Sequence, residues 1–139
     1  MTATKVSRPI AGSWKLLTVT TSHPDLPHPK SALTVFAASP DGLRYKAETT
    51  WSDGRATVAE ADFKLDGSWS PVTGSPLADS VSLHAIDERN YEAALRKSGV
   101  ESGRNKIRIS SDGQTMLTEW ELIVPGGPTI HLKTIFERM

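Results

Sequence analysis

Turn signals divide this chain at nearly regular intervals, and their spacing limits the folds that are open to it. Asp-Gly pairs occur at 41–42, 53–54, 66–67 and 112–113, and a Gly-Gly pair follows at 126–127. Asp-Gly supplies the positive φ angles that tight hairpin turns require. Three of the intervals between these signals span 12 or 13 residues, which leaves room for strands of about seven to ten residues. The spacing predicts short strands joined by hairpins.

The segments between the turns alternate apolar and polar residues, which is typical of strands with one buried and one solvent-facing side. Odd-numbered residues are mostly apolar in 43–51, and even-numbered ones in 114–124. Segment 91–97 has a helix-like composition, but it is short and lacks a cap, so we predict a strand there too. In total we predict about nine or ten strands, at 13–20, 32–39, 43–51, 55–65, 68–72, 80–86, 90–97, 104–110, 114–124 and 128–137.

So many strands in 139 residues favour a closed sheet. A flat sheet of this width would expose two edges, whereas an up-and-down barrel has none. An immunoglobulin-like sandwich is the alternative, but it uses fewer strands and Greek-key connections. We therefore predict an all-β fold, an antiparallel β-barrel with little or no helix, as a single domain over 1–139 with an N-terminal extension at 1–10. A barrel of more than eight strands is wide enough to hold a ligand cavity.

Composition excludes several functional classes. The chain has no cysteine, which removes disulfides, thiolate metal sites and thiol chemistry. Sixteen basic and sixteen acidic residues balance, so no overall field attracts nucleic acid. The sequence contains no apolar run that could span a membrane, and its start has no secretory signal. We predict a soluble cytoplasmic protein with no cofactor, no metal, no nucleic-acid partner and no membrane span; its oligomeric state is left open.

Both ends of the chain resemble the calycin superfamily. GSWKL at 12–16 resembles the G-x-W start shared by lipocalins and intracellular fatty-acid-binding proteins, and IFER at 135–138 resembles the terminal V-Y-E-R strand of fatty-acid-binding proteins. Segments 39–43, 72–76 and 111–116 look like those of small uncharacterised bacterial lipocalin-like proteins. The resemblance implies a bacterial lipocalin-like barrel from about residue 10 to the end.

The resemblance also implies specific contacts and specific differences. Lipocalins stack an arginine near the C-terminus on the G-x-W tryptophan, which here would pair Arg138 with Trp14. Fatty-acid-binding proteins place two helices after the first strand, but the prolines of segment 21–31 forbid a helix, so we predict a stiff portal there. Where that family binds a carboxylate with an R-x-Y pair, this chain has Thr134 and Phe136. We therefore predict a neutral ligand.

The leading functional prediction is binding of a small hydrophobic molecule inside the barrel. Aromatic, methionine and threonine side chains fall on the faces that we assign inward, on several strands, and such a set is typical of a small-molecule site. The predicted ligand-binding residues are Tyr45, Trp51, Phe63, Tyr91, Met116, Thr118, Trp120, Thr134 and Phe136.

Two alternatives stay open. A barrel enzyme of the isomerase, cyclase or lyase type would need an inward acid, base or hydroxyl, and Tyr45, Tyr91, Glu60 and Asp62 are the candidates. Haem binding is the third possibility, because nitrobindins carry a histidine ligand on the last strand and His131 occupies a similar place. The alternation of the last strand, however, assigns His131 to the polar outer face.

Overall fold

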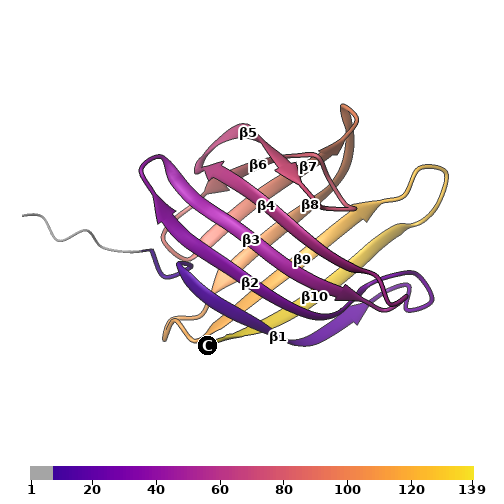
Figure 1. The fold of residues 1–139 in the computed structure, drawn as a ribbon, viewed down its shortest axis with the longest axis horizontal. Coiled ribbons are helices and arrows are strands. Elements are labelled where there is room, and N and C mark those ends of the chain that lie inside the picture. Colours follow the sequence, from indigo (N-terminus) through magenta and orange to yellow (C-terminus); the bar gives the residue numbers. More distant parts are fainter. Residues whose placement is uncertain (1–7) are drawn as a thin grey trace, which may run out of the picture.

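Ten antiparallel strands close into a single barrel in the computed structural model, which describes residues 8–139 (Figure 1). Each strand pairs with its neighbours in sequence, and β1 closes the barrel against β10. The described residues contain no helix, so the predicted all-β barrel is confirmed. The strands are β1 Gly12–Thr21, β2 Pro29–Ser39, β3 Gly42–Trp51, β4 Ala56–Lys64, β5 Asp66–Thr73, β6 Ser80–Ala85, β7 Asn90–Lys97, β8 Val100–Ile109, β9 Thr115–Ile123 and β10 Thr129–Arg138.

The residues that alternate along each strand form the inner and the outer surface of the barrel. Along the β9–β10 pair, Thr118 lies opposite Thr134 and Met116 opposite Phe136, and all four side chains are buried. Glu119, between two inward residues, is exposed. Residues paired across neighbouring strands point to the same side of the sheet, so alternate residues of every strand gather in one largely apolar interior.

One predicted hairpin turn is displaced. The connection between β4 and β5 is made at Leu65, and the Asp66-Gly67 pair lies inside β5, where the pairing with β6 is irregular. Two local hydrogen bonds hold Asp66 there: its carboxylate accepts from the backbone N–H of Ser68 at 2.9 Å and from the Ser68 hydroxyl at 2.6 Å. An Asp-Gly pair therefore accommodates a bulge here rather than a turn.

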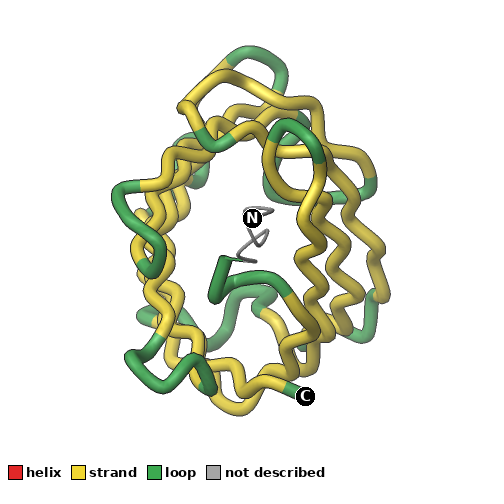
Figure 2. The backbone as a smooth tube through the Cα atoms, turned by 90° about the vertical axis from the view of Figure 1, so that its left-hand side faces the viewer, coloured by secondary structure: helices red, strands yellow, loops and turns green. Residues whose placement is uncertain are grey.

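One end of the barrel is plugged by the segment that precedes β1. Residues 8–11 fold into the ring of strands, as the view along the barrel shows (Figure 2). Ile10 and Trp14 have no exposed surface, and the Trp14 indole Nε1 donates to the Ile10 carbonyl at 2.9 Å. The guanidinium of Arg138 lies 4.3 Å from the Trp14 ring, as predicted. Residues 8–10 thus belong to the packed domain; the rest of the predicted extension, 1–7, lies outside the described residues.

The other end of the barrel carries two long connections. Segment 22–28 joins β1 to β2 without a helix; its ends are tied down, with Ser22 N donating to His131 O at 2.9 Å and Ser52 N to His28 O at 2.8 Å. Segment 74–79 joins β5 to β6 and is fixed by Ser102, whose hydroxyl donates to Leu77 O at 2.9 Å. We call 74–79 the mouth loop.

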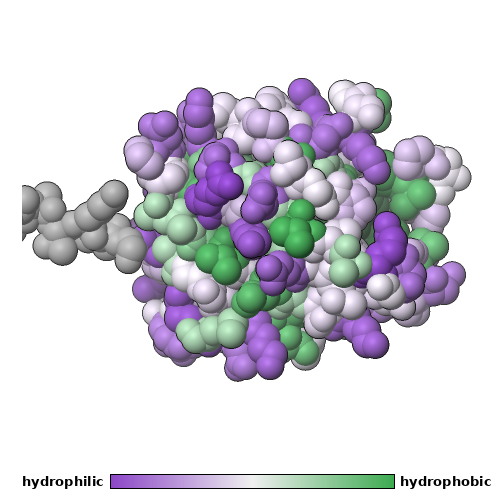
Figure 3. Space-filling model, viewed as in Figure 1, coloured by the Kyte–Doolittle hydropathy of each residue, from purple (hydrophilic) through white to green (hydrophobic). Residues whose placement is uncertain are grey.

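The outer surface of the barrel mixes polar and apolar residues. In the face drawn in Figure 3, hydrophilic and hydrophobic side chains are interspersed. The cross-strand ion pair of Arg44 with Asp62, whose Nη1 and Oδ2 atoms are 2.7 Å apart, lies on this outer side. Across residues 8–139 we find no helix with the length and apolar character needed to cross a membrane.

Replacing Gly74 by alanine is expected to displace the mouth loop. Its φ is +76°, and an added Cβ would lie 1.8 Å from the Val58 carbonyl oxygen, so the backbone itself must move. Gly99 is the matched control, because its φ is +77° but nothing lies within 4 Å of its Cβ position. We expect Gly99→Ala to lower the free energy of unfolding by about 1 kcal/mol and Gly74→Ala by about 1–3 kcal/mol more, measured by urea denaturation. Equal losses would contradict the close contact.

Candidate functional site

A cavity of about 140 Å³ lies inside the barrel, between the plug and the mouth loop. All ten strands and the mouth loop contribute residues to its lining. Most of these side chains are aliphatic or aromatic. The polar side chains at its wall are uncharged: they are threonines, one serine, one asparagine, one tyrosine and two tryptophans. Among the described residues that line it, none carries a formal charge.

Eight of the nine predicted ligand-binding residues lie at this cavity. They are Tyr45, Trp51, Phe63, Met116, Thr118, Trp120, Thr134 and Phe136. The structure brings them together because each of their strands directs alternate residues inward, the odd-numbered ones in β3 and β4 and the even-numbered ones in β9 and β10. Their contact with a ligand stays a prediction.

Tyr91 does not line the cavity. It is almost fully buried near the plugged end, where its hydroxyl donates to Glu88 O at 3.1 Å and accepts from Arg8 Nη1 at 3.4 Å. Alternation correctly predicts that this side chain points inward, but not its height along the barrel axis. Tyr91 therefore belongs to the packing of the closed end.

The other catalytic and haem candidates also lie away from the cavity. Asp62 is on the outer surface, paired with Arg44, and Glu60 is not among the lining residues. His131 is exposed on the outer face of β10, so it is not placed to ligate a group held inside the barrel. Tyr45 is the one enzyme candidate whose side chain reaches the cavity.

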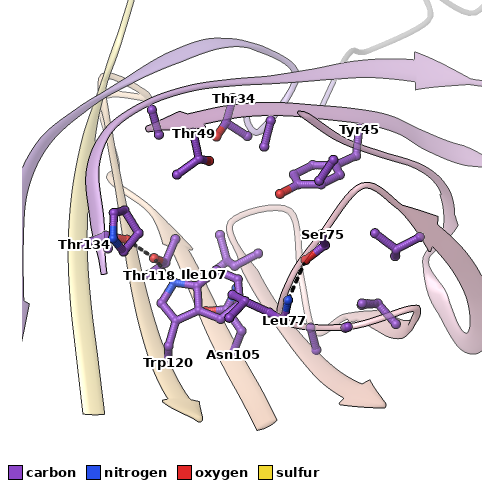
Figure 4. A pocket seen from close by; sticks show the side chains of 18 of the residues that line it. Thr34, Tyr45, Thr49, Ser75, Leu77, Asn105, Ile107, Thr118, Trp120 and Thr134 are labelled. Carbon is purple, nitrogen blue, oxygen red and sulfur yellow. Dashed lines mark hydrogen bonds between the residues drawn. The ribbon is translucent and has the colours of Figure 1, made fainter. Parts of the chain in front are cut away.

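Several of the polar groups in the wall have hydrogen-bond partners, and Figure 4 marks the bonds of Thr118 with Thr134 and of Leu77 with Ser75. The Thr118 hydroxyl is hydrogen-bonded to that of Thr134 and also accepts from Trp120 Nε1 at 2.9 Å. On the opposite side, Trp51 Nε1 donates to the Thr57 hydroxyl at 2.9 Å. These hydrogen bonds satisfy the N–H donors of both indoles, so the indoles present mainly apolar surface to the cavity.

Asn105 is the described wall residue with a fully buried polar side-chain atom that lacks a partner, and the sequence-based prediction did not include it. It lies on β8 opposite Trp120 and is only 6% exposed, and its Oδ1 atom has no hydrogen-bond partner among the described residues. A buried carbonyl without a partner costs about 1–3 kcal/mol. The signal was present in the sequence, because Asn105 shares the inward parity of Ile107 and Ile109.

The mouth loop was also missed as part of the site. The sequence patterns predict only a connection between two strands here. Four of its residues nevertheless line the cavity, namely Ser75, Pro76, Leu77 and Ala78. A hydrogen bond from Leu77 N to the Ser75 hydroxyl, 3.1 Å long, shapes the loop (Figure 4). From the predicted portal 21–31, Pro29 reaches the cavity and Leu26 packs against the neighbouring cluster of Leu122, Ile130 and Leu132.

Tyr45 projects into the cavity from β3 between two other aromatic rings. Its ring centroid lies 5.3 Å from that of Phe36 and 5.2 Å from that of Phe63. Burial raises the pKa of the Tyr45 hydroxyl to about 12, because the phenolate would lose its hydration in this apolar setting. The hydroxyl is therefore neutral at physiological pH and is poorly suited to act as a general base.

The Tyr45 pKa predicts a loss of stability at high pH. The unfolded chain releases the phenol proton near pH 10, whereas the folded chain holds it to about pH 12, so stability falls as the pH rises through this window. This contribution is at most about 2.7 kcal/mol. We expect Tyr45→Phe to flatten the decline between about pH 10 and pH 12 in urea denaturation. An unchanged pH dependence in Tyr45→Phe would contradict the burial of this hydroxyl.

Fold and site together define a closed ten-stranded antiparallel barrel with an uncharged internal cavity. No family model and no curated protein matches the chain. Among solved structures, a redesigned β-barrel, mFAP0, bound to DFHBI, aligns over 94% of this chain and 99% of that chain, with a TM-score of 0.47 and 16% sequence identity. Membership of the calycin superfamily stays a prediction based on the two chain ends.

Proposed function

We propose that this protein binds a small, uncharged and mostly apolar molecule inside its barrel. The observation that carries the proposal is the cavity of about 140 Å³, whose described lining residues include no charged side chain. A carboxylate buried there would have no cation to compensate its lost hydration, whereas an apolar molecule would lose little. The cavity chemistry therefore favours a neutral ligand over a fatty acid anion.

The size of the cavity supports a compact ligand. An apolar protein cavity of about 150 Å³ is known to accommodate benzene. A molecule with a single ring therefore fits without rearrangement, and a longer one would have to extend towards the mouth loop. The plug at the other end, with Ile10 fully buried, supports entry from the side of the mouth loop.

The geometry gives less support to catalysis. Within the described part of the chain, neither a carboxylate nor an imidazole lines the cavity. The Tyr45 hydroxyl is the remaining titratable group there, and it stays protonated up to about pH 12. A binding role accounts for this wall without requiring a proton transfer.

Filling the cavity tests the proposal. Ala47 lines the cavity and is buried, so Ala47→Phe should occupy the space that a ligand needs. We expect toluene to bind the unaltered protein, and Ala47→Phe to weaken that binding at least about tenfold, a change of about 1.4 kcal/mol. Chemical shifts of backbone amides in an NMR titration provide the measurement.

The outer surface offers a matched control. Ala37 is exposed on β2, so Ala37→Phe adds the same ring outside the barrel. Its toluene affinity should equal that of the unaltered protein. Equal binding by both variants and the unaltered chain would show that toluene lies elsewhere and would refute the proposed site.

A further inference from the structure

We propose that the ligand carries a hydrogen-bond donor, an O–H or N–H group, which it directs at Asn105 in the cavity wall. This inference rests on the proposed function and specifies its ligand class: a compact ring compound with one hydroxyl or N–H group, rather than a pure hydrocarbon. Asn105 would then be the specificity-determining residue of the site.

The Asn105 amide lacks a partner for its carbonyl group among residues 8–139. Its Oδ1 atom is buried and has no hydrogen-bond partner in the described chain. The residue lies among the cavity-lining side chains, next to Trp120 on β9 and Ala93 on β7 (Figure 4). Native proteins satisfy nearly all buried polar atoms, so an unpartnered carbonyl at a cavity indicates a missing donor.

The inward side chains beside Asn105 on its own strand and on the two adjacent strands do not supply this donor. The indole N–H of Trp120, on the adjacent strand, is committed to Thr118. Ala93, on the other side, has no polar side chain, and Ile107 follows on the same inward face of β8. A ligand in the cavity is therefore the group best placed to provide a donor to Asn105.

An unpaired Asn105 carbonyl would also make the cavity selective among ligands of the same shape. A site built around a buried hydrogen-bonding group discriminates strongly against an analogue that lacks the matching group, because the protein atom is then left unpaired. A wholly apolar wall discriminates weakly between ligands of the same shape. Asn105 therefore changes the ligand preference of a cavity that would otherwise select only by size.

Phenol and toluene form a probe pair for this inference, because they match in size and differ in the hydroxyl. NMR titration would give the dissociation constants of both for the unaltered protein and for Asn105→Leu, which removes the amide at similar volume. We expect Asn105→Leu to weaken phenol binding relative to toluene binding at least about tenfold. The thermal midpoint of the variant should be equal or higher, because a buried unpaired carbonyl is removed. If Asn105→Leu does not fold, Asn105→Val, with a strand-favouring side chain, serves instead.

The outcomes separate this inference from the proposed function. A loss of phenol affinity relative to toluene affinity in Asn105→Leu supports the donor, whereas a relative gain overturns it. Binding of both probes with an unchanged ratio overturns it, leaves the apolar cavity as the binding site and indicates that water satisfies Asn105. If neither probe binds the unaltered protein, both the inference and the proposed function fail.

Discussion

Replacement of Arg138 by methionine is expected to lower the free energy of unfolding by about 3 kcal/mol and the melting temperature by about 10 °C. The guanidinium donates to the carbonyls of Gly113 and Ala11, each at 2.7 Å, and to that of Pro9, and it stacks on Trp14. One side chain therefore joins the plug, the β8–β9 turn and the barrel wall. Methionine keeps the apolar contact but leaves three carbonyls without their donor.

Arg108 provides the control for this prediction. It is exposed on β8, outside the barrel, so Arg108→Met should change stability by less than about 0.5 kcal/mol. Arg138→Lys keeps the charge, but its single ammonium nitrogen replaces the three guanidinium nitrogens that each reach a different carbonyl, and we expect it to recover less than half of the loss. If thermal and urea denaturation show equal stabilities for Arg138→Met and Arg108→Met, the plug is not held by this residue.

The second large effect is expected from placing a charge in the cavity wall. Thr134 is 3% exposed and lies opposite Thr118 in surroundings without a formal charge. Thr134→Arg buries a cation without a partner, which should cost about 3–5 kcal/mol. Benzoate should then raise the melting temperature of this variant in a concentration-dependent way, because it supplies the missing anion.

Thr129→Arg is the matched control, because Thr129 is exposed on the same strand. It should be as stable as the unaltered protein and should not respond to benzoate. A Thr134→Arg variant that is equally stable and equally indifferent to benzoate would show that position 134 is open to solvent.

Alternation and turn chemistry account for how well the sequence predicts this fold. An inward Met116 requires an inward Thr118 and Trp120, since the side-chain period of a strand is two residues. The terminal tryptophan and arginine were recognised through a resemblance, and the structure places them in contact. Strand existence, strand order and inward faces could therefore all be predicted from local patterns.

Position along the barrel axis could not be predicted in the same way. Tyr91 and Tyr45 have the same inward parity, yet Tyr91 packs at the plugged end while Tyr45 reaches the cavity. Height depends on the stagger between strands, which sequence alternation does not encode.

The contribution of the mouth loop was not predicted for a related reason. A loop has no side-chain periodicity, so its sequence does not indicate the direction in which it folds. Asn105 was not predicted because the prediction selected inward aromatic, methionine and threonine side chains, and a single inward asparagine is not in that set.

An internal site for an uncharged ligand can be tested by titrating the unaltered protein with toluene and with benzoate near pH 7. Both compounds have one ring, and they differ mainly in charge. We expect saturable amide shifts for toluene, centred on the inward residues of β3, β8 and β9, and no such shifts for benzoate at the same concentrations. Tighter binding of benzoate, or toluene shifts confined to outward-facing residues, would contradict it.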